Sequence, residues 1–564
     1  MSRRRATGRS AASLAAGLAA VLIGAVGCTG QSAPSNPPGP PGRARTAASP
    51  APEKVLAAGS LPADRIGPPT AACATVQRPT GWIAAENKKP GDDGWKAAKS
   101  PDTLVNGYLG EVSAACGDLV DLHVAGYVSS ASVTAYRIGW YGGKGGRAVW
   151  RAADVPVAGS GAGNAMAPST VEESWPVSDK IKITPDWTPG YYLIVVTAGD
   201  GHGSAIPLVI RDGSGPSGSG TAPLLFQASV LTYQAYNLFG GYSLYAGPDG
   251  KSATRARVAS FDRPYADSGY AAPFMYDIPL AQRIEQIGLD ADYTTDIDVD
   301  QRPSQVAAHQ ALIVGGHSEY WTRRMYDAAD YARDHGVNIA FFGANTVYWH
   351  ARLEPSPAGP DRRMVVYRAQ ADDPLAAADP SRSTTEWRSP PLNRPEAGLV
   401  GADFGELGTT GGGFRVLAAN SWIFAGTGEA NGRVLKASLG GEWDTVKPEV
   451  AVTPPDIDVI AAAPIVWLGS RTMATMSYYT APSGAGVFAG GTTYWPCQLA
   501  MSCHDFVVDP GSSRVLTQMT DNVLRAFAAG PAGQLHPSVR SLAPSADALI
   551  STAATPGDVA VRAK

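Results

Sequence analysis

The sequence predicts an α/β protein that begins with an all-β domain, and three observations lead to this class. Between residues 72 and 212, short runs rich in β-branched and aromatic residues are separated by Gly, Pro and Asp turns. A Gly/Ser-rich linker at 213–221 then marks a domain boundary. From 222 to about 530, continuous apolar runs alternate with helical segments, which is typical of a parallel sheet covered on both faces.

The N-terminus resembles a bacterial lipoprotein signal. A basic start, MSRRRATGRS, precedes the apolar run SLAAGLAAVLIGAVG, which is too short to span a bilayer comfortably and ends Ala25-Val26-Gly27-Cys28. We expect cleavage before Cys28 and lipid on its sulfur, so that the protein is exported and anchored on the extracytoplasmic face of the cell membrane. The alternative is plain secretion with an incidental cysteine. Residues 29–71, rich in Pro, Ala and Ser, predict a disordered tether.

Export gives meaning to the four remaining cysteines, because an even number in an oxidising compartment favours disulfides. Proximity along the chain favours the pairs Cys73–Cys116 and Cys497–Cys503, although four cysteines allow three pairings. A cysteine zinc site is disfavoured because the sequence has no CxxC pair.

The net charge of −4 and the pI of about 6.1 argue against a nucleic-acid-binding protein, which needs a basic surface to neutralise phosphates. At 564 residues the chain is too long for one core, so two or three domains are expected.

In the first domain, the runs LVDLHVAGYV, SVTAYRIGWYGG, KIKITPDW and GYYLIVVTAG predict the strands of an immunoglobulin-like β-sandwich. In the second, APLLFQASVL, DADYTTDIDV, HQALIVGG and VNIAFFGANT predict strands of an open, mostly parallel, doubly wound sheet of the flavodoxin- or amidotransferase-like kind. TRRMYDAADYARDHG predicts a helix, with Thr322 as its N-cap and Gly336 as its stop. A polar C-terminal tail is expected over 531–564.

Functional groups of open α/β sheets gather beyond the carboxyl ends of the strands. Four predicted strands end in polar side chains there, so the residues that follow them are candidates for one shared crevice. Each also has a structural alternative as a turn, solvated or core residue. The candidates are Tyr233, Tyr236, Asn237, Asp296, Asp298, His317, Glu319 and Asn345.

The stretch GGHSEYW allows two kinds of chemistry. A serine hydrolase with Ser318 as nucleophile is disfavoured, because Tyr320 stands where the second glycine of the G-x-S-x-G elbow belongs. A carboxylate with phenolates suits a hard cation such as Fe(III), which polarises a carbonyl and activates water. A neighbouring His or Glu would then transfer the proton.

Seven motifs occur in an order that resembles the large (beta) subunit of N,N-dimethylformamidase and the proteins that share its C-terminal domain. The resemblance covers roughly residues 125 to 450, and the run from QAYN through GANTVYWHAR is the specific part. The motifs are IGWYGGKGGR, LTYQAYNLFGGYSLY, SFDRPY, GGHSEYWT, FFGANTVYWHAR, SWIFAGTG and GGEWD.

The resemblance implies an amidohydrolase with one iron ion, expected as Fe(III), held by two tyrosinates and one glutamate. Glu319 would be the carboxylate and Tyr236 of QAYN one tyrosinate. The second would come from PGYYLIVV, where we choose Tyr192 over Tyr191. If so, the β-domain must dock rigidly on the α/β domain.

The resemblance also implies the residues that act on the substrate. His317 falls where a proton-transfer residue is expected, and Asn345 where an amide orients the substrate or stabilises an oxyanion. Glu442 of GGEWD is the candidate for the second acid/base residue.

We therefore expect an exported, lipid-anchored, iron-dependent hydrolase of a small-molecule amide, in which a metal-activated water cleaves the C–N bond. The substrate does not follow from the resemblance. Because the dimethylformamidase works with a small partner subunit, a small subunit or a homo-oligomer belongs to the expectation. The competing readings are a non-catalytic cell-surface binding or structural lipoprotein that keeps the scaffold, and the serine hydrolase.

Overall fold

A computed structural model describes residues 60–66, 78–98, 104–159, 165–166, 170–199, 201, 203–212, 222–410, 412–467, 470–501, 507–553 and 558–562. The predicted signal peptide with Cys28, the linker 213–221, and both Cys73 and Cys503 lie outside these residues. Cys116 and Cys497 lie inside them and are buried, and the two disulfide pairings stay predictions.

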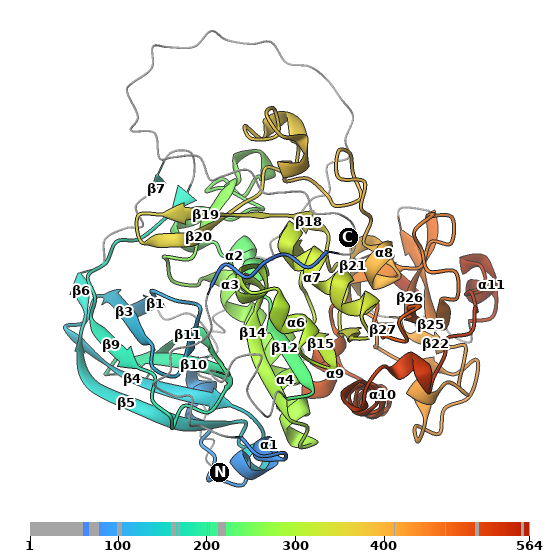
Figure 1. Cartoon of the computed structure of the whole chain (residues 1–564), viewed down its shortest axis with the longest axis horizontal. Coiled ribbons are helices and arrows are strands. Elements are labelled where there is room, and N and C mark those ends of the chain that lie inside the picture. Colours follow the sequence, from blue (N-terminus) through green and yellow to red (C-terminus); the bar gives the residue numbers. More distant parts are fainter. Residues whose placement is uncertain are drawn as a thin grey trace, which may run out of the picture. The chain divides into compact units, whose positions relative to one another are not determined.

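Two small sheets make up the N-terminal β-region (Figure 1). One contains β1 (Val105–Leu109), β3 (Leu119–Gly126), β6 (Ala158–Gly159) and β9 (Asp179–Lys182). The other has the order β2 (Ser113–Ala115), β11 (Gly203–Arg211), β10 (Gly190–Thr197), β4 (Ser130–Ile138) and β5 (Gly146–Pro156). Alternate side chains of both sheets, such as Leu122, Val124 and Ile194, form one separate core, as the strand period of two requires.

A twelve-stranded mixed sheet follows. Five neighbouring strands are parallel, and all their residues are buried, including polar ones such as Gln227, Thr294 and Asn338. In sheet order they are β14 (Ala291–Thr295), β12 (Leu224–Ala228), β15 (Ala311–Val314), β17 (Asn338–Phe341) and β27 (Gly486–Ala489). The sheet continues antiparallel through β26 (Ser470–Thr480) and β25 (Asp458–Trp467).

The remaining strands complete this sheet or form small ribbons. They are β7 (Ala165–Met166), β8 (Thr170–Val171), β13 (Val258–Ser260), β16 (Tyr320–Trp321), β18 (Trp349–His350), β19 (Arg352–Ser356), β20 (Gly359–Val365), β21 (Asp403–Thr410), β22 (Phe414–Val416), β23 (Val434–Leu435), β24 (Gly441–Thr445) and β28 (Ala560–Arg562). Because parallel and antiparallel strands combine with helices, the mixed α/β class is confirmed.

The α-helices mostly connect the parallel strands. They are α1 (Trp82–Glu86), α2 (Val230–Tyr236), α3 (Asp267–Ala272), α4 (Ile278–Gln286), α5 (Asp296–Gln301), α6 (Ser304–Ala307), α7 (Arg323–Asp334), α8 (Ala397–Val400), α9 (Trp495–Ala500), α10 (Pro510–Ala529) and α11 (Ala546–Ser551). The predicted caps of α7 are confirmed. The Thr322 hydroxyl accepts from the backbone N–H of Met325, and Gly336 follows the helix with φ 94°.

A buried ion pair joins the β-region to the α/β region. Arg137 on β4 donates to Glu285 on α4 at 2.6 and 2.8 Å, and both side chains are fully buried. The guanidinium also donates to the Pro189 carbonyl and to the Tyr141 hydroxyl. With its hydrogen bonds satisfied on both sides, this pair links the two regions rigidly.

Two segments expected outside the folded domains contact them instead. Within the predicted tether, Arg65 pairs with Asp300, and its backbone N–H donates to the Gln301 carbonyl. Within the predicted C-terminal tail, β28 pairs with β25 and β21, and Ala560 is fully buried. Both segments therefore contribute to the fold.

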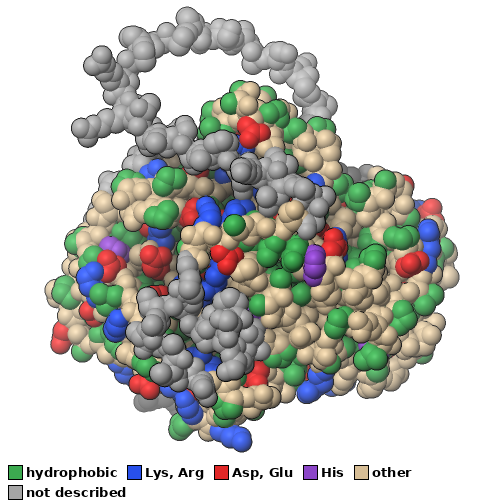
Figure 2. All heavy atoms as spheres, in the orientation of Figure 1, with side chains coloured by type: hydrophobic (Ala, Val, Ile, Leu, Met, Phe, Trp, Pro, Cys, Tyr) green, Lys and Arg blue, Asp and Glu red, His purple; other side chains and the backbone are tan. Residues whose placement is uncertain are grey.

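Among the described residues, no helix is both long and apolar enough to cross a membrane. Figure 2 shows acidic and basic side chains interspersed with apolar and neutral ones on the face that it presents.

Candidate active site

Four loops that leave the sheet carry the polar side chains of the candidate site. Strand β12 leads into α2, which ends at Tyr236, and β15 leads into Gly315, Gly316 and then His317. The loop after β17 carries Asn345, while β24 carries Glu442. Three of the four strand exits grouped from the sequence, those after β12, β15 and β17, therefore contribute to the cluster.

The loops approach closely because two of them contain glycine at the contact. The backbone N–H of Ala344 donates to the Gly316 carbonyl, and a Cβ placed on Gly343 would overlap that same oxygen. A side chain at Gly343 would push the His317 loop and the Asn345 loop apart, whereas one at Gly316 would meet Pro496 and Tyr276.

Glu319 lies at the centre of the cluster with only 3% exposure. One carboxylate oxygen, Oε2, accepts from the hydroxyl of Tyr236 at 3.2 Å and from that of Tyr245. The other, Oε1, accepts from Trp349 Nε1 at 3.0 Å. The Glu319 backbone N–H donates to the Thr232 hydroxyl. Both carboxylate oxygens are therefore held in place, with two phenol oxygens beside Oε2.

The two phenols form one unit. The Tyr236 and Tyr245 rings stack at 4.3 Å between centroids and 28° between planes. Burial, followed by the neighbouring Glu319 carboxylate, raises the pKa of each phenol well above 10. Both therefore keep their protons unless a cation takes the place of those protons.

Arg368 supplies a positive charge beside the phenols. Its guanidinium lies 4.3 Å from the Tyr245 ring centroid and 4.8 Å from that of Trp349. It also donates to the Tyr320 hydroxyl at 2.9 Å, which in turn donates to that of Tyr245. This charge partly offsets the rise in the pKa of Tyr245 and favours its anionic form.

His317 connects the phenols to a second carboxylate. Its Nε2 lies 3.0 Å from the Tyr236 hydroxyl and 3.6 Å from Oε2 of both Glu319 and Glu442. Burial raises the pKa of Glu442, the nearby His317 lowers it, and Glu319 raises it. Glu442 therefore holds a proton at a higher pH than an ordinary glutamate does.

Asn345 positions Glu442. Its side-chain Nδ2 donates to Glu442 Oε2 at 2.7 Å, and its backbone N–H donates to Asp444 Oδ1 at 2.8 Å. The residue has φ 50°, a left-handed conformation that asparagine tolerates better than most residues. The buried Oδ1 has no hydrogen-bond partner in the structure, so an acceptor remains for an added N–H group.

The structure does not bring Tyr192 to this cluster, which corrects the expected ligand set. Its hydroxyl donates to the Thr188 carbonyl at 2.7 Å, and its ring stacks on Trp187 inside the sandwich core. Successive residues of a strand face opposite sides, so Tyr191 faces the α/β region instead. The Tyr191 hydroxyl donates to that of Tyr233 at 3.3 Å.

Tyr245 is the residue that sequence reasoning missed, although it ends the quoted motif LTYQAYNLFGGYSLY. The signal was the spacing: a Gly-Gly turn after QAYN lets the chain fold back, and Leu244 bonds to the carbonyl of Ala235. This turn places Tyr245 against Tyr236.

Other candidates at the strand ends have structural roles. Asp296 accepts from the N–H of Leu231, and Asp298 forms the capping box of α5. Asn237 binds backbone groups of the following loop. Tyr233 donates to the buried Asp277 carboxyl, whose pKa burial raises to about 8.

Ser318 is fully buried. Its hydroxyl oxygen accepts from Trp321 Nε1 at 3.0 Å and lies 3.5 Å from Gln227 Nε2. Among the described residues, no histidine is hydrogen-bonded to that hydroxyl. The arrangement thus gives the serine hydrolase reading no support.

The donor set suits a hard cation. In the part of the chain that the structure describes, no group of three or more His, Cys, Asp or Glu side chains is placed to hold a metal. An ion beside Glu319 would therefore depend on the phenol oxygens. One carboxylate and two adjacent phenols, buried and next to an arginine that favours phenolate, fit Fe(III).

Comparison with known proteins gives one finding about the family. A search of the curated proteins finds no match. The model of the family described as "N,N-dimethylformamidase beta subunit-like, C-terminal" matches residues 132–505, which cover every residue of the cluster and most of the chain. This chain therefore belongs to the N,N-dimethylformamidase beta subunit-like family.

Proposed function

We propose that the protein is an iron-dependent hydrolase of small amides, with Tyr236, Tyr245 and Glu319 as the iron ligands. The observation that carries the proposal is the sharing of Glu319 Oε2 between two stacked phenols. Membership of a family described by an amidase agrees with it. A bound Fe(III) ion would supply a Lewis acid that polarises the amide carbonyl and lowers the pKa of water.

The protein's own groups divide the remaining work. His317 lies between Tyr236 and Glu442, so it can accept a proton on one side and pass it to the carboxylate on the other. Glu442, with its raised pKa, then donates this proton to the departing amine. Asn345 holds Glu442 through Nδ2, and its unpartnered Oδ1 can accept from a substrate N–H.

We also propose the finer features of the fold. We assign the two small sheets to an immunoglobulin-like sandwich and the parallel strands to a flavodoxin-like sheet.

The proposal includes the cellular location. Cleavage before Cys28 would give an exported, lipid-anchored enzyme with the disulfides Cys73–Cys116 and Cys497–Cys503. Replacing Cys28 by Ser should move the protein from the membrane fraction to the soluble exported fraction. A variant that stays in the membrane fraction would contradict the anchor.

Metal analysis together with the visible spectrum tests the iron site. Protein expressed with iron should contain one iron per chain and show a tyrosinate-to-Fe(III) charge-transfer band. Tyr236→Phe and Tyr245→Phe should each weaken or abolish the band. The matched control is Tyr192→Phe, which removes only a hydrogen bond to a backbone carbonyl and should leave the band unchanged. Loss of the band in Tyr192→Phe alone would restore the ligand set expected from the sequence.

Release of dimethylamine from N,N-dimethylformamide, the substrate that the family description names, tests the reaction class. Other small formamides and acetamides extend the test to related amides. A colourless protein that takes up no iron and hydrolyses none of these amides would instead favour the non-catalytic binding protein.

A further inference from the structure

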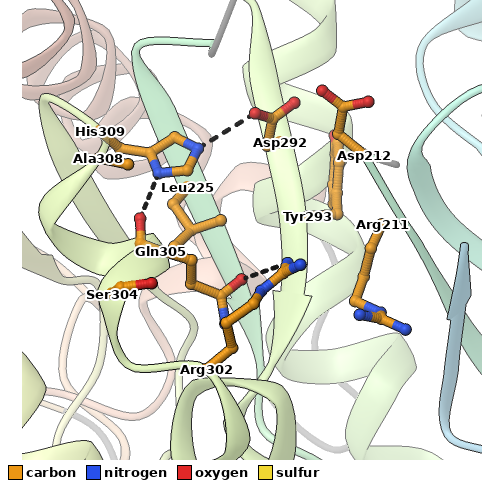
Figure 3. A pocket seen from close by; sticks show the side chains of 10 residues that line it. All are labelled: Arg211, Asp212, Leu225, Asp292, Tyr293, Arg302, Ser304, Gln305, Ala308 and His309. Atoms are coloured by element: carbon orange, nitrogen blue, oxygen red, sulfur yellow. Dashed lines mark hydrogen bonds and ion pairs between the residues drawn. The ribbon is translucent and has the colours of Figure 1, made fainter. Parts of the chain in front are cut away.

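A small cavity lies where the β-region meets the large sheet, apart from the cluster around Glu319. Its volume is about 40 Å³, enough for two or three water molecules or one small ion. Figure 3 shows that its walls come from the end of β11, from β14 and from the loop around α6. The charged and polar side chains that face it are Arg211, Asp212, Asp292, Arg302, Gln305 and His309.

Arg302 is the unusual member of this set. It is only 7% exposed, and its Nε and Nη1 atoms have no hydrogen-bond partner among the residues that the structure describes. Its Nη2 reaches only the neutral Gln305 Oε1, at 3.4 Å. Among the described residues no carboxylate lies within ion-pair distance of it. A guanidinium keeps its charge even when buried, so this charge lacks a counterion.

The other charged side chains around the cavity each lie within bonding distance of a partner. Asp212 pairs with Arg78 at 2.6 Å, and Asp292 Oδ2 lies 3.1 Å from His309 Nε2. Arg211, on the opposite wall, pairs with Asp298 at 3.3 Å. Of the charged side chains that line the cavity, Arg302 is therefore the one without such a partner among the described residues. Burial and then the nearby Arg211 lower the pKa of Arg302, while Asp298, Asp64 and Asp212 partly oppose this shift.

We propose that this cavity binds a small oxyanion, such as inorganic phosphate, sulfate or a short carboxylate, with Arg302 as its main ligand. The planar guanidinium presents Nε and one Nη as a fork that matches two oxygens of such an anion. Arg211 adds a second positive charge from the end of β11. The bound anion would connect the β-region to the loop before α6.

The site is independent of the proposed hydrolase, because none of its residues contacts Tyr236, Tyr245 or Glu319. Its test can therefore succeed or fail regardless of whether the protein binds iron. The cavity is too small for a nucleotide or a lipid headgroup, so inorganic phosphate, sulfate and acetate are the probes.

Thermal unfolding of the full protein tests the proposal. Phosphate, sulfate and acetate are titrated in turn against sodium chloride at equal ionic strength, which separates binding from screening. At least one oxyanion should raise the Tm in a saturable way. The rise should be about 2–5 °C when the anion concentration is about 100 times its Kd. Isothermal titration with the same anion then gives the affinity. The absence of any saturable rise over chloride would overturn the proposal.

Arg302→Gln should weaken the affinity for that anion about 10–100-fold, the usual effect of losing a charged hydrogen bond. In anion-free buffer its Tm should be no lower than that of the parent, because the variant removes an uncompensated charge. Arg471→Gln is the matched control, since that side chain is 57% exposed and pairs with Asp547 at the surface. Its anion affinity should equal the parent's.

Two outcomes of the mutational test would also overturn the proposal. One is undiminished anion binding in Arg302→Gln. The other is a Tm several degrees lower in anion-free buffer, which would show that Arg302 is a satisfied structural residue. Where Arg302→Gln does not fold, Arg302→Lys keeps the charge and loses the fork. The same affinity in that variant would likewise contradict the proposed role of the guanidinium.

Discussion

Asp444→Asn should remove a pH dependence of stability that the buried carboxyl of Asp444 creates. Asp444 is 2% exposed, and its Oδ1 accepts the backbone N–H of Asn345 at 2.8 Å. Burial raises the pKa of this carboxyl from 3.8 to about 8, and the Asn345 N–H only partly opposes the rise. The asparagine variant keeps the shape and the acceptor but cannot ionise.

The sign of the effect follows from proton linkage. A raised pKa means that the folded state binds the proton more tightly than the unfolded state. The stabilising contribution is therefore complete below pH 4 and is lost as the pH rises toward 8. For each pH unit in this window, the free energy of unfolding of the parent falls by about 1.4 kcal/mol relative to that of the variant. Between pH 4 and 9, the difference in the free energy of unfolding between the two proteins should shift by on the order of 5 kcal/mol in favour of Asp444→Asn.

Chemical unfolding of both proteins at pH 4, 5, 6, 7, 8 and 9 measures this difference, and other buried acids cancel because both chains contain them. Asp249→Asn is the control, because hydrogen bonds to Thr254 and Lys251 lower the pKa of that exposed carboxyl. The free energy of unfolding of Asp249→Asn, taken relative to that of the parent, should therefore not increase as the pH rises. Parallel stability curves for Asp444→Asn and the parent would refute the reasoning and show that Asp444 ionises normally in the fold.

Three further outcomes are expected. Glu442→Gln should lower kcat for amide hydrolysis about 10²–10⁴-fold while the iron content stays unchanged, and loss of iron would instead make Glu442 a ligand. Gly343→Ala should destabilise the protein by about 1–3 kcal/mol, because its Cβ meets the Gly316 carbonyl; an unchanged Tm would disprove the tight contact. Glu285→Gln should cost about 3–5 kcal/mol by leaving Arg137 buried without its counterion, measured by urea unfolding. A cost below 1 kcal/mol there would show that the two regions do not depend on this pair.

Most of the features of the fold that the sequence predicts depend on patterns within short segments. The alternation of apolar runs and helical segments is encoded within a few residues, and so are the caps of α7 at Thr322 and Gly336. Neighbouring parallel strands end at the same edge of the sheet, so the polar residues that follow them are expected to lie close together. That grouping brought together His317, Asn345 and Tyr236.

Contacts between distant segments had no such local signal. The pairing of β28 with β25 joins residues almost one hundred positions apart, and the polar composition of 531–564 says nothing about it. The docking of Arg65 on Asp300 within an expected tether is of the same kind.

The sequence by itself determined the mixed α/β class, the family and the strand ends that carry His317 and Glu319. Only the tertiary structure shows that Tyr245, and not Tyr192, lies beside Glu319. Alternation along β10 shows that Tyr191 and Tyr192 face opposite sides, but not which side faces the sandwich core. The packing of the two sheets decides that, and it buries Tyr192 there while the turn after QAYN brings Tyr245 to Glu319.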